Sequence, residues 1–256
     1  MQLSDTHAHL YLPEFDDDRH LVIKRARKAG VERIYLPNID RGTLPGLRRL
    51  CKAYPSTCFP MAGLHPGSVK ADYREELRFV EATLSTGGYC GIGEIGIDLY
   101  WDNRYKKEQI AAFTRQLELA VSYRLPAIIH VRNAFEEVFT VLDELNCPGL
   151  RGIFHCFSGN EEQAEKALSY GGFKLGIGGV LTFKKNLLAS VVAGTGLKDM
   201  VLETDAPYLT PAPFRGKRNE SAYVLHVAEK MAEIKSIGLQ EVAEATTAAT
   251  AEVFGF

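Results

Sequence analysis

The sequence predicts a single α/β domain, residues 1–256, folded as a TIM (β/α)8 barrel. The chain has 256 residues, and such a barrel typically needs about 250. Short β-rich runs alternate with longer segments of helical periodicity along the whole chain. Eight such units in one series, with no low-complexity linker, indicate a closed parallel barrel. A doubly wound sheet is the alternative, but no Gly-x-Gly-x-x-Gly follows the first strand.

The individual elements follow from these patterns. We expect strands at residues 2–6, 32–37, 58–64, 89–94, 126–130, 151–155, 172–178 and 199–204. Helical patterns cover residues 18–29, 42–53, 74–85, 106–123, 134–145, 161–170, 185–193, 221–235 and 239–254. The clearest is 106–123, in which Ile110, Phe113, Leu117 and Ala120 recur at steps of three and four residues.

Composition narrows the functional classes. Apolar residues make up 46% of the chain and charged residues 24%, as in soluble enzymes with a full core. No apolar run approaches the roughly 20 residues of a membrane span, and the N-terminus lacks a secretion signal. Five cysteines form no C-x-x-C pair, which fits free thiols in a reducing cytoplasm. We therefore expect a cytoplasmic protein without membrane association.

The net charge of −2 lacks the basic excess of proteins that coat nucleic acid. Any contact with nucleic acid should therefore be local, at a chain end held in a pocket.

Polar residues gather where the predicted strands end. In a parallel barrel the chemistry lies at the C-terminal ends of the strands. In chain order, these ends carry His7 and His9, Asn38, His65, Glu94, His130, His155, the glycines of 176–179, and Asp205. Five of the seven histidines are among them. The other two, His20 and His226, lie on helical patterns and are interpreted as surface or packing residues.

This distribution predicts a metal centre. His7 and His9 are two residues apart, so in an extended chain both project to one side and reach one ion. A single histidine after a buried run, such as His130 or His155, could be a core residue with a satisfied hydrogen bond. Several histidines and carboxylates that converge on one barrel mouth must instead be paired or bound to metal. We expect two divalent ions with Glu94 bridging them, held by His7, His9, Glu94, His130, His155 and Asp205.

Mixed imidazole and carboxylate ligands suit Zn²⁺ or Mn²⁺, and Mg²⁺ less well. Glu203 and Asp205 share one strand face. We interpret Asp205 as a ligand and water activator, and Glu203, one layer deeper, as an acceptor that supports a ligand. Alternatively, Glu203 pairs with a lysine or arginine inside the barrel. Asp5 would accept from a histidine or cap a turn. Cys156 follows His155 and should face away from it, as strand neighbours do.

Six ordered segments resemble the TatD-type metal-dependent deoxyribonucleases: Ser4–Leu10, Gly63–Gly67, Gly91–Asp98, Pro126–Ala134, His155–Gly159 and Leu202–Leu209. The resemblance covers nearly the whole chain. It implies a TIM-barrel hydrolase of the amidohydrolase-like group that uses two divalent metals on DNA ends. It further implies a 3′→5′ exonuclease linked to DNA repair and to DNA breakdown in cell death. By that pattern His7, His9, Glu94 and Asp205 hold one ion, and Glu94, His130 and His155 hold the other.

The resemblance also implies how substrate binds, with Asp205, Glu94 and His65 as the catalytic residues. His65 would approach the scissile phosphate with help from Arg132. Arg215 and Arg218 of a basic loop would grip neighbouring phosphates, unless that loop is only a solvated surface. The expected partner is DNA, single-stranded or at 3′ ends, and no protein partner is implied. Tyr208, Trp101 or Phe157 could stack a base, although Trp101 could also be part of the rim packing.

Three positions depart from the family pattern: Tyr11, Ser221 and Ala249 stand where an acidic or amide residue, a proline and an asparagine are common. A rival interpretation keeps the metals and changes the bond, because the same ligand set serves amide, lactone and ester hydrolysis. Another rival is a barrel that binds metal without catalysis.

Overall fold

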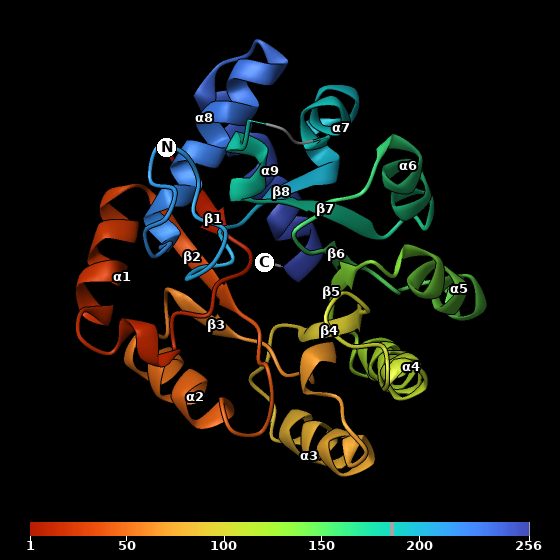
Figure 1. Ribbon diagram of the computed structural model, residues 1–256. Helices are drawn as coiled ribbons and strands as arrows, with labels where there is room; N and C mark the ends of the chain where they lie inside the picture. The colour runs from red at the N-terminus through yellow and green to blue at the C-terminus, as the bar shows by residue number, and fades with distance from the viewer. Residues whose placement is uncertain (185–186, 256) are drawn as a thin grey trace.

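The computed structural model describes residues 1–184 and 187–255 of the chain. Within these residues, eight parallel strands form a central barrel that a ring of helices surrounds (Figure 1). The strands are β1 (Leu3–Asp5), β2 (Val31–Leu36), β3 (Cys58–Pro60), β4 (Ile92–Asp98), β5 (Ala127–Arg132), β6 (Gly152–Phe154), β7 (Phe173–Ile177) and β8 (Met200–Leu202). The predicted TIM-like α/β barrel is confirmed.

Backbone hydrogen bonds close the ring at both seams between the two ladders, β1-β2-β3 and β4-β5-β6-β7-β8. At one seam, Thr6 N donates to Leu202 O at 3.0 Å. At the other, Ala62 N donates to Gly91 O at 3.2 Å and Gly93 N donates to Ala62 O at 3.0 Å. The C-terminal ends of all the strands therefore meet at one mouth.

The helices follow the strands as predicted. They are α1 (Arg19–Lys28), α2 (Leu44–Ala53), α3 (Tyr73–Ser85), α4 (Lys106–Tyr123), α5 (Phe135–Leu145), α6 (Glu161–Ser169), α7 (Leu188–Gly194), α8 (Val224–Lys235) and α9 (Leu239–Phe254). Short 3-10 helices lie at η1 (Pro13–Phe15), η2 (Pro66–Ser68), η3 (Gly179–Thr182), η4 (Leu197–Asp199) and η5 (Ser221–Tyr223). Of the helix predicted at 185–193, residues 185 and 186 lie outside the described residues.

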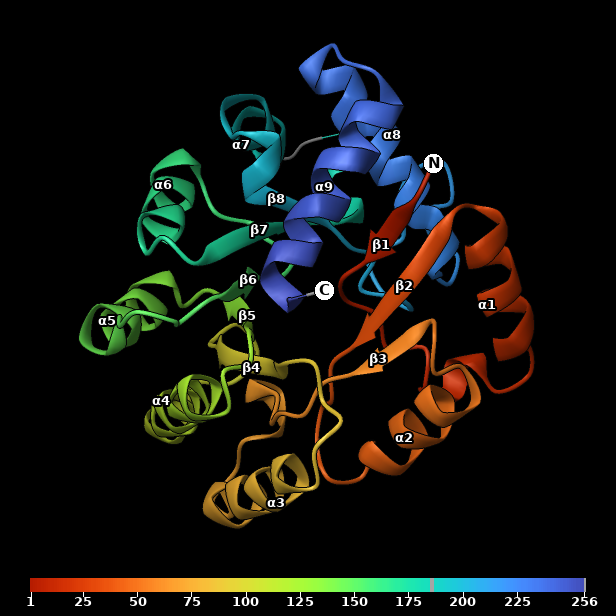
Figure 2. The same ribbon diagram turned by 180° about the vertical axis from the view of Figure 1, so that it is seen from behind.

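Helix α9 covers the end of the barrel opposite the mouth, and Figure 2 shows it in front of the strands. The ring of Tyr35, which is buried inside the barrel, stacks on Phe254 with 3.9 Å between ring centroids. Ala249 belongs to the same buried cluster as Tyr35. A small apolar residue at position 249 therefore packs against the barrel interior.

Strand β4 differs from its prediction. The sequence suggested a strand at 89–94 that ends on Glu94, but β4 begins at Ile92 and continues through Glu94 to Asp98. The glycines that suggested a strand end instead allow close contact between neighbouring strands. Gly96 has a φ of 135°, and a Cβ atom there would lie 2.0 Å from His130 O of β5. The pairing register shifts between Ile92 and Ile95, and such irregularities re-aim side chains.

Two further features concern the whole chain. The five cysteines are free thiols. None of the helices in the described part of the chain has the length and apolarity needed to cross a membrane.

Candidate active site

A cavity of about 740 Å³ lies at the mouth of the barrel. Seven of the predicted site residues line it: His9, His65, Glu94, His130, Arg132, His155 and Asp205. His7 lies directly beneath, fully buried. Residues that are distant in the sequence are thus brought together at the C-terminal ends of the strands, where a barrel carries its chemistry.

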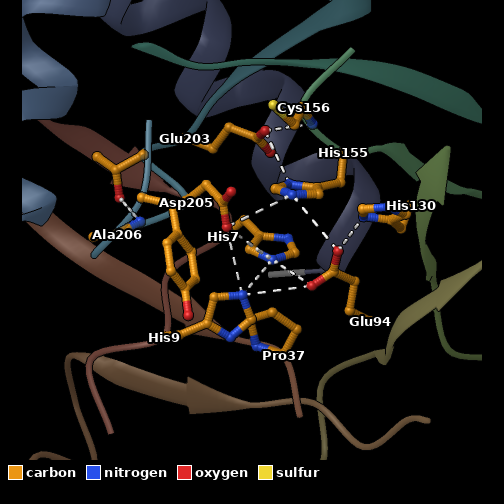
Figure 3. A network of polar contacts seen from close by, with 12 residues as sticks. His7, His9, Pro37, Glu94, His130, His155, Cys156, Glu203, Asp205 and Ala206 are labelled. Atoms are coloured by element: carbon orange, nitrogen blue, oxygen red, sulfur yellow. Dashed lines mark hydrogen bonds and ion pairs between the residues drawn. The ribbon is translucent and has the colours of Figure 1, made fainter. Parts of the chain in front are cut away.

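The first group of donors comes from the segments that follow β1 and β8 and from β4 (Figure 3). His7 Nε2 lies 3.1 Å from both His9 Nε2 and Glu94 Oε2. His9 Nε2 lies 3.5 Å from Glu94 Oε2 and from Asp205 Oδ1. Two imidazole nitrogens and two carboxylate oxygens that face one another at these separations are a donor set that fits a divalent ion such as Zn²⁺ or Mn²⁺.

The second group surrounds the other oxygen of Glu94. Glu94 Oε1 lies 2.8 Å from His130 Nδ1, 3.4 Å from His65 Nε2 and 3.8 Å from His155 Nε2. Glu94 therefore directs one oxygen at each group, as a bridging carboxylate requires. By distance alone His65 is a better ligand for the second ion than His155, contrary to the roles that the resemblance implies.

Hydrogen bonds at the other ring nitrogen distinguish His65 from a ligand. His65 Nδ1 accepts from Gly67 N at 2.9 Å, so in the neutral ring the proton is on Nε2, which faces the cavity. A metal ligand needs a bare nitrogen, whereas a protonated Nε2 is a donor. This favours His65 as a hydrogen-bond donor to substrate.

Three other histidines, His130, His155 and His9, are held in the opposite sense. His130 Nε2 lies 3.1 Å from Asp98 Oδ2, and His155 Nδ1 lies 3.0 Å from Glu203 Oε1. Each carboxylate favours a proton on the ring nitrogen that it faces, so the ring nitrogen directed at Glu94 is bare. Carboxylates behind the ligands of a metal site orient metal-binding histidines in this way.

The acceptor for His9 is Tyr11. Tyr11 Oη lies 2.8 Å from His9 Nδ1 and donates to Pro37 O at 2.6 Å. Because the hydroxyl has one proton and gives it to the carbonyl, the hydroxyl oxygen must accept from His9 Nδ1–H. In the neutral ring, the form that binds a metal, His9 Nε2 is then bare and directed at His7 and Glu94. The sequence analysis noted Tyr11 as a departure from the family pattern and did not predict its contact with His9.

Asp98 was missed by the sequence analysis. It ends the Gly91–Asp98 segment, but the predicted strand stopped at Glu94, so Asp98 was assigned to the following connection. The structure places it at the true end of β4, beside His130. The sequence analysis looked for polar residues at strand ends. It would have selected Asp98 if the end of β4 had been placed at residue 98 and not at residue 94.

The charges in the centre are strongly coupled. Burial lowers the pKa of His7 to about 4, and the neighbouring His155 adds to this effect. Burial also acts to lower the pKa of His9, but Asp205 and Glu94 outweigh it and raise the value to about 9. Burial alone would raise the pKa of Glu94, but His65, His7 and His155 hold it well below its usual range. Glu94 is therefore ionised, as a ligand must be.

Glu203 and Asp5 have different supporting roles. Glu203 is fully buried, and its Oε1 accepts from Cys156 N at 2.5 Å and lies close to His155. Its ion-pair partner among the described residues is thus a histidine and not the lysine or arginine of the alternative. Asp5 accepts from Thr204 N at 2.9 Å and from Thr204 Oγ1 at 2.6 Å. These bonds link the end of β1 to the segment after β8. Asp5 Oδ1 also accepts from His7 N at 3.3 Å, which caps the turn after β1, and burial raises the pKa of Asp5 to about 7.

The prediction that Cys156 faces away from the site was wrong, because Cys156 lines the cavity. Strand β6 ends at Phe154, and Cys156 adopts a φ of 45°. The alternation of strand neighbours therefore does not extend to it.

Of the three predicted arginines, the structure brings only Arg132 into the cavity. The Arg215 guanidinium packs over the Phe183 ring, 3.7 Å from its centroid. Arg218 forms an ion pair with Asp18 at 2.8 Å. Neither is among the residues that line the cavity, and both have contacts that stabilise the loop that carries them.

Comparison with known proteins agrees with the family that the sequence predicted. A model of the family described as TatD related DNase matches residues 4–255. The chain belongs to the TatD family. The predicted family is therefore confirmed.

Three relatives indicate the range of this family. The uncharacterized metal-dependent hydrolase YabD of Bacillus subtilis is 39% identical over 246 residues, with 96% of each chain covered. A 3'-5' ssDNA/RNA exonuclease TatD of Yersinia pseudotuberculosis is 31% identical over 228 residues, 86% of each chain. The crystal structure of the TatD homologue YjjV of Escherichia coli superposes with a TM-score of 0.93 at 30% identity, over 99% of this chain and 98% of that one.

Proposed function

We propose that this TatD-family chain is a metal-dependent hydrolase that removes nucleotides from the 3′ end of single-stranded DNA. The observation that carries the proposal is Glu94, whose two oxygens face two separate groups of nitrogen and oxygen donors at the floor of one cavity. Two adjacent metal sites that share a carboxylate are suited to the displacement of a phosphate ester. The nuclease function of the Yersinia relative adds support for this substrate class.

In this proposal each donor group holds one ion. His7, His9, Glu94 and Asp205 would hold one, and Glu94, His130 and His155 the other. Bound ions would supply Lewis-acid charge and make a water molecule more acidic. The cavity needs such charge to accept a phosphate, because its lining carries four carboxylates, Glu94, Asp98, Asp102 and Asp205, against the cations Lys70 and Arg132.

The chain's own groups would handle the proton and the substrate. Burial raises the pKa of Asp205, but His9, His155 and His7 outweigh it and lower the value. Asp205 is therefore ionised at neutral pH and able to accept the proton of the attacking water. His65, with its protonated Nε2 directed at the cavity, would donate to a phosphate oxygen. Arg132 would bind an adjacent phosphate through paired N–H donors.

The test is digestion of 3′- and 5′-labelled single-stranded DNA by protein reconstituted with Mg²⁺, Mn²⁺ or Zn²⁺. We expect a ladder that starts from the 3′ end and is lost in Glu94→Ala. Glu244→Ala, on the exposed side of α9, is the matched control and should cleave normally. Absence of cleavage with all three ions, in protein shown to contain them, would overturn the nuclease assignment. Small esters, lactones and amides would then be the substrates to try.

A further inference from the structure

The chain contains a single tryptophan, and its side chain is presented to solvent at the cavity. Trp101 lies on the connection between β4 and α4, lines the cavity and is 77% exposed. The adjacent Tyr100 is 51% exposed and meets the indole edge to face, with ring centroids 4.7 Å apart. Large aromatic surfaces at the edge of a binding cavity are poorly hydrated and favour a flat, apolar ligand.

Arg132 completes this group from the neighbouring strand. Its Cζ lies 3.8 Å from the centroid of the Tyr100 ring and 5.2 Å from that of Trp101. The guanidinium makes no hydrogen bond or ion pair with any residue of 1–184 or 187–255. Contact with the two rings therefore positions the guanidinium, while its five N–H donors remain available in a geometry that matches a phosphate.

The position of this group relative to the donor cluster is set by β5. His130 and Arg132 are two residues apart in β5, so both side chains project from the same face. Asp98, at the end of β4, pairs in register with Arg132, and the connection with Tyr100 and Trp101 begins directly after it. A strand end whose terminal phosphodiester lies at Glu94 and His130 would therefore extend past Arg132 and reach the indole.

We propose that Trp101 and Arg132 form a nucleotide subsite, in which the indole stacks an unpaired base and the guanidinium binds that nucleotide's phosphate. The proposal rests on the proposed nuclease function and specifies its substrate. A base must be free of its complementary strand to reach an indole, so the subsite selects single-stranded ends. Because every base has a π-face, stacking of this kind tolerates any sequence.

The single tryptophan makes the subsite directly observable, because emission excited at a wavelength that tyrosine does not absorb comes from Trp101 alone. The probe is a phosphorothioate-linked hexathymidylate, which resists cleavage, titrated into the metal-loaded wild-type protein. We expect saturable quenching of the emission. The matched oligomer of abasic deoxyribose phosphates has the same charge and no bases, and it should bind without the quenching. Equal quenching by both oligomers, or by neither, would overturn base stacking.

Variants test the energetic contribution through the anisotropy of a labelled hexathymidylate. Trp101→Ala should weaken binding about five- to one-hundred-fold, since stacking on an aromatic ring is worth about that factor per base. Arg132→Met should weaken binding and reduce the slope of log K against log salt by about one. Tyr123→Ala is the control, because Tyr123 is an exposed aromatic at the far end of α4. Wild-type affinity in Trp101→Ala would refute the subsite.

The outcomes for the subsite and for the nuclease function are separable. If Trp101→Ala digests single-stranded DNA from the 3′ end as well as the wild type does, the subsite is refuted and the exonuclease stands. If the hexathymidylate quenches Trp101 but no metal supports cleavage, the base-binding site stands and the exonuclease does not.

Discussion

Tyr11→Phe removes a single oxygen atom from the outer layer of the donor cluster. In the wild type this hydroxyl accepts from His9 Nδ1 at 2.8 Å and donates to Pro37 O at 2.6 Å, and Tyr11 is buried. Phenylalanine fills the same space with the same ring. The change therefore leaves two buried polar groups, the His9 Nδ1–H and the Pro37 carbonyl, without their partner.

The magnitude has two parts. A buried polar group that loses its partner costs about 1–3 kcal/mol. With partial relaxation around the two groups, the free energy of unfolding of the metal-free protein should fall by about 2–4 kcal/mol. Separately, loss of the acceptor behind a metal-binding histidine typically lowers metal affinity by about 10–100-fold. The His9 ring would no longer be held with Nε2 bare and directed at His7 and Glu94.

Chelator competition measures the affinity for Zn²⁺ or Mn²⁺, and urea titration measures stability. The control is Tyr170→Phe, which removes a hydroxyl that donates to Asp143 Oδ1 at 2.8 Å and lies 3.2 Å from Phe139 O. Tyr170 does not line the cavity, so its loss should reduce stability and leave metal affinity unchanged. If Tyr11→Phe binds metal as tightly as the wild type does, the assignment of Tyr11 as the residue that orients His9 is refuted.

Three further predictions concern other parts of the structure. Glu203→Gln keeps the shape of a side chain 3.0 Å from His155 and removes its charge, so metal affinity should fall about tenfold without loss of fold, as chelator competition and circular dichroism would show. Arg218 and Arg25 lower the pKa of Asp18 from 3.8 to about 2; this stability is present above pH 3.8 and is lost as pH falls through about 2. Asp18→Asn should therefore cost about 1–2 kcal/mol at pH 7, allowing for partial exposure, and urea titrations should show the gap from wild type narrowing between pH 4 and pH 2. Gly96→Ala places a Cβ atom 2.0 Å from His130 O at a φ of 135°, so it should destabilise the protein by about 3 kcal/mol or more; a wild-type melting temperature would contradict the description of β4.

Much of the donor cluster was predictable because each member obeys a local rule. A buried apolar run followed by one polar residue marks a strand end, and in a parallel barrel all such ends meet. His7, His155 and Asp205 follow this rule, and His130 lies two residues before the end of β5. All four lie together around Glu94. The closed barrel could be predicted from the regular alternation of strands and helices. These features depend on periodicity, which a sequence displays directly.

The remaining features depend on backbone geometry that periodicity does not encode. The register shift near Gly93 carries β4 past Glu94 to Asp98, so the support for His130 was missed. The positive φ of Cys156 turns its side chain into the cavity after β6 has ended. Arg218 was expected to bind phosphate because it lies in a basic loop, but it forms an ion pair with Asp18. In each case a contact between segments distant in the sequence decided the position.

Strands β4 and β5 carry the two requirements of the proposed reaction in the same order along their length. The floor of the cavity is formed by Glu94 and His130, and the rim by Trp101 and Arg132, which follow them in the chain. The floor is rich in carboxylates and histidines and needs cations to accept a phosphate, whereas the rim presents an arginine and an exposed indole. Metal dependence and preference for unpaired ends should thus be separable, because they reside in different layers. In the proposed reaction, the direction of the two strands would set the direction of the substrate, from a bond cleaved at the floor outward across the start of α4.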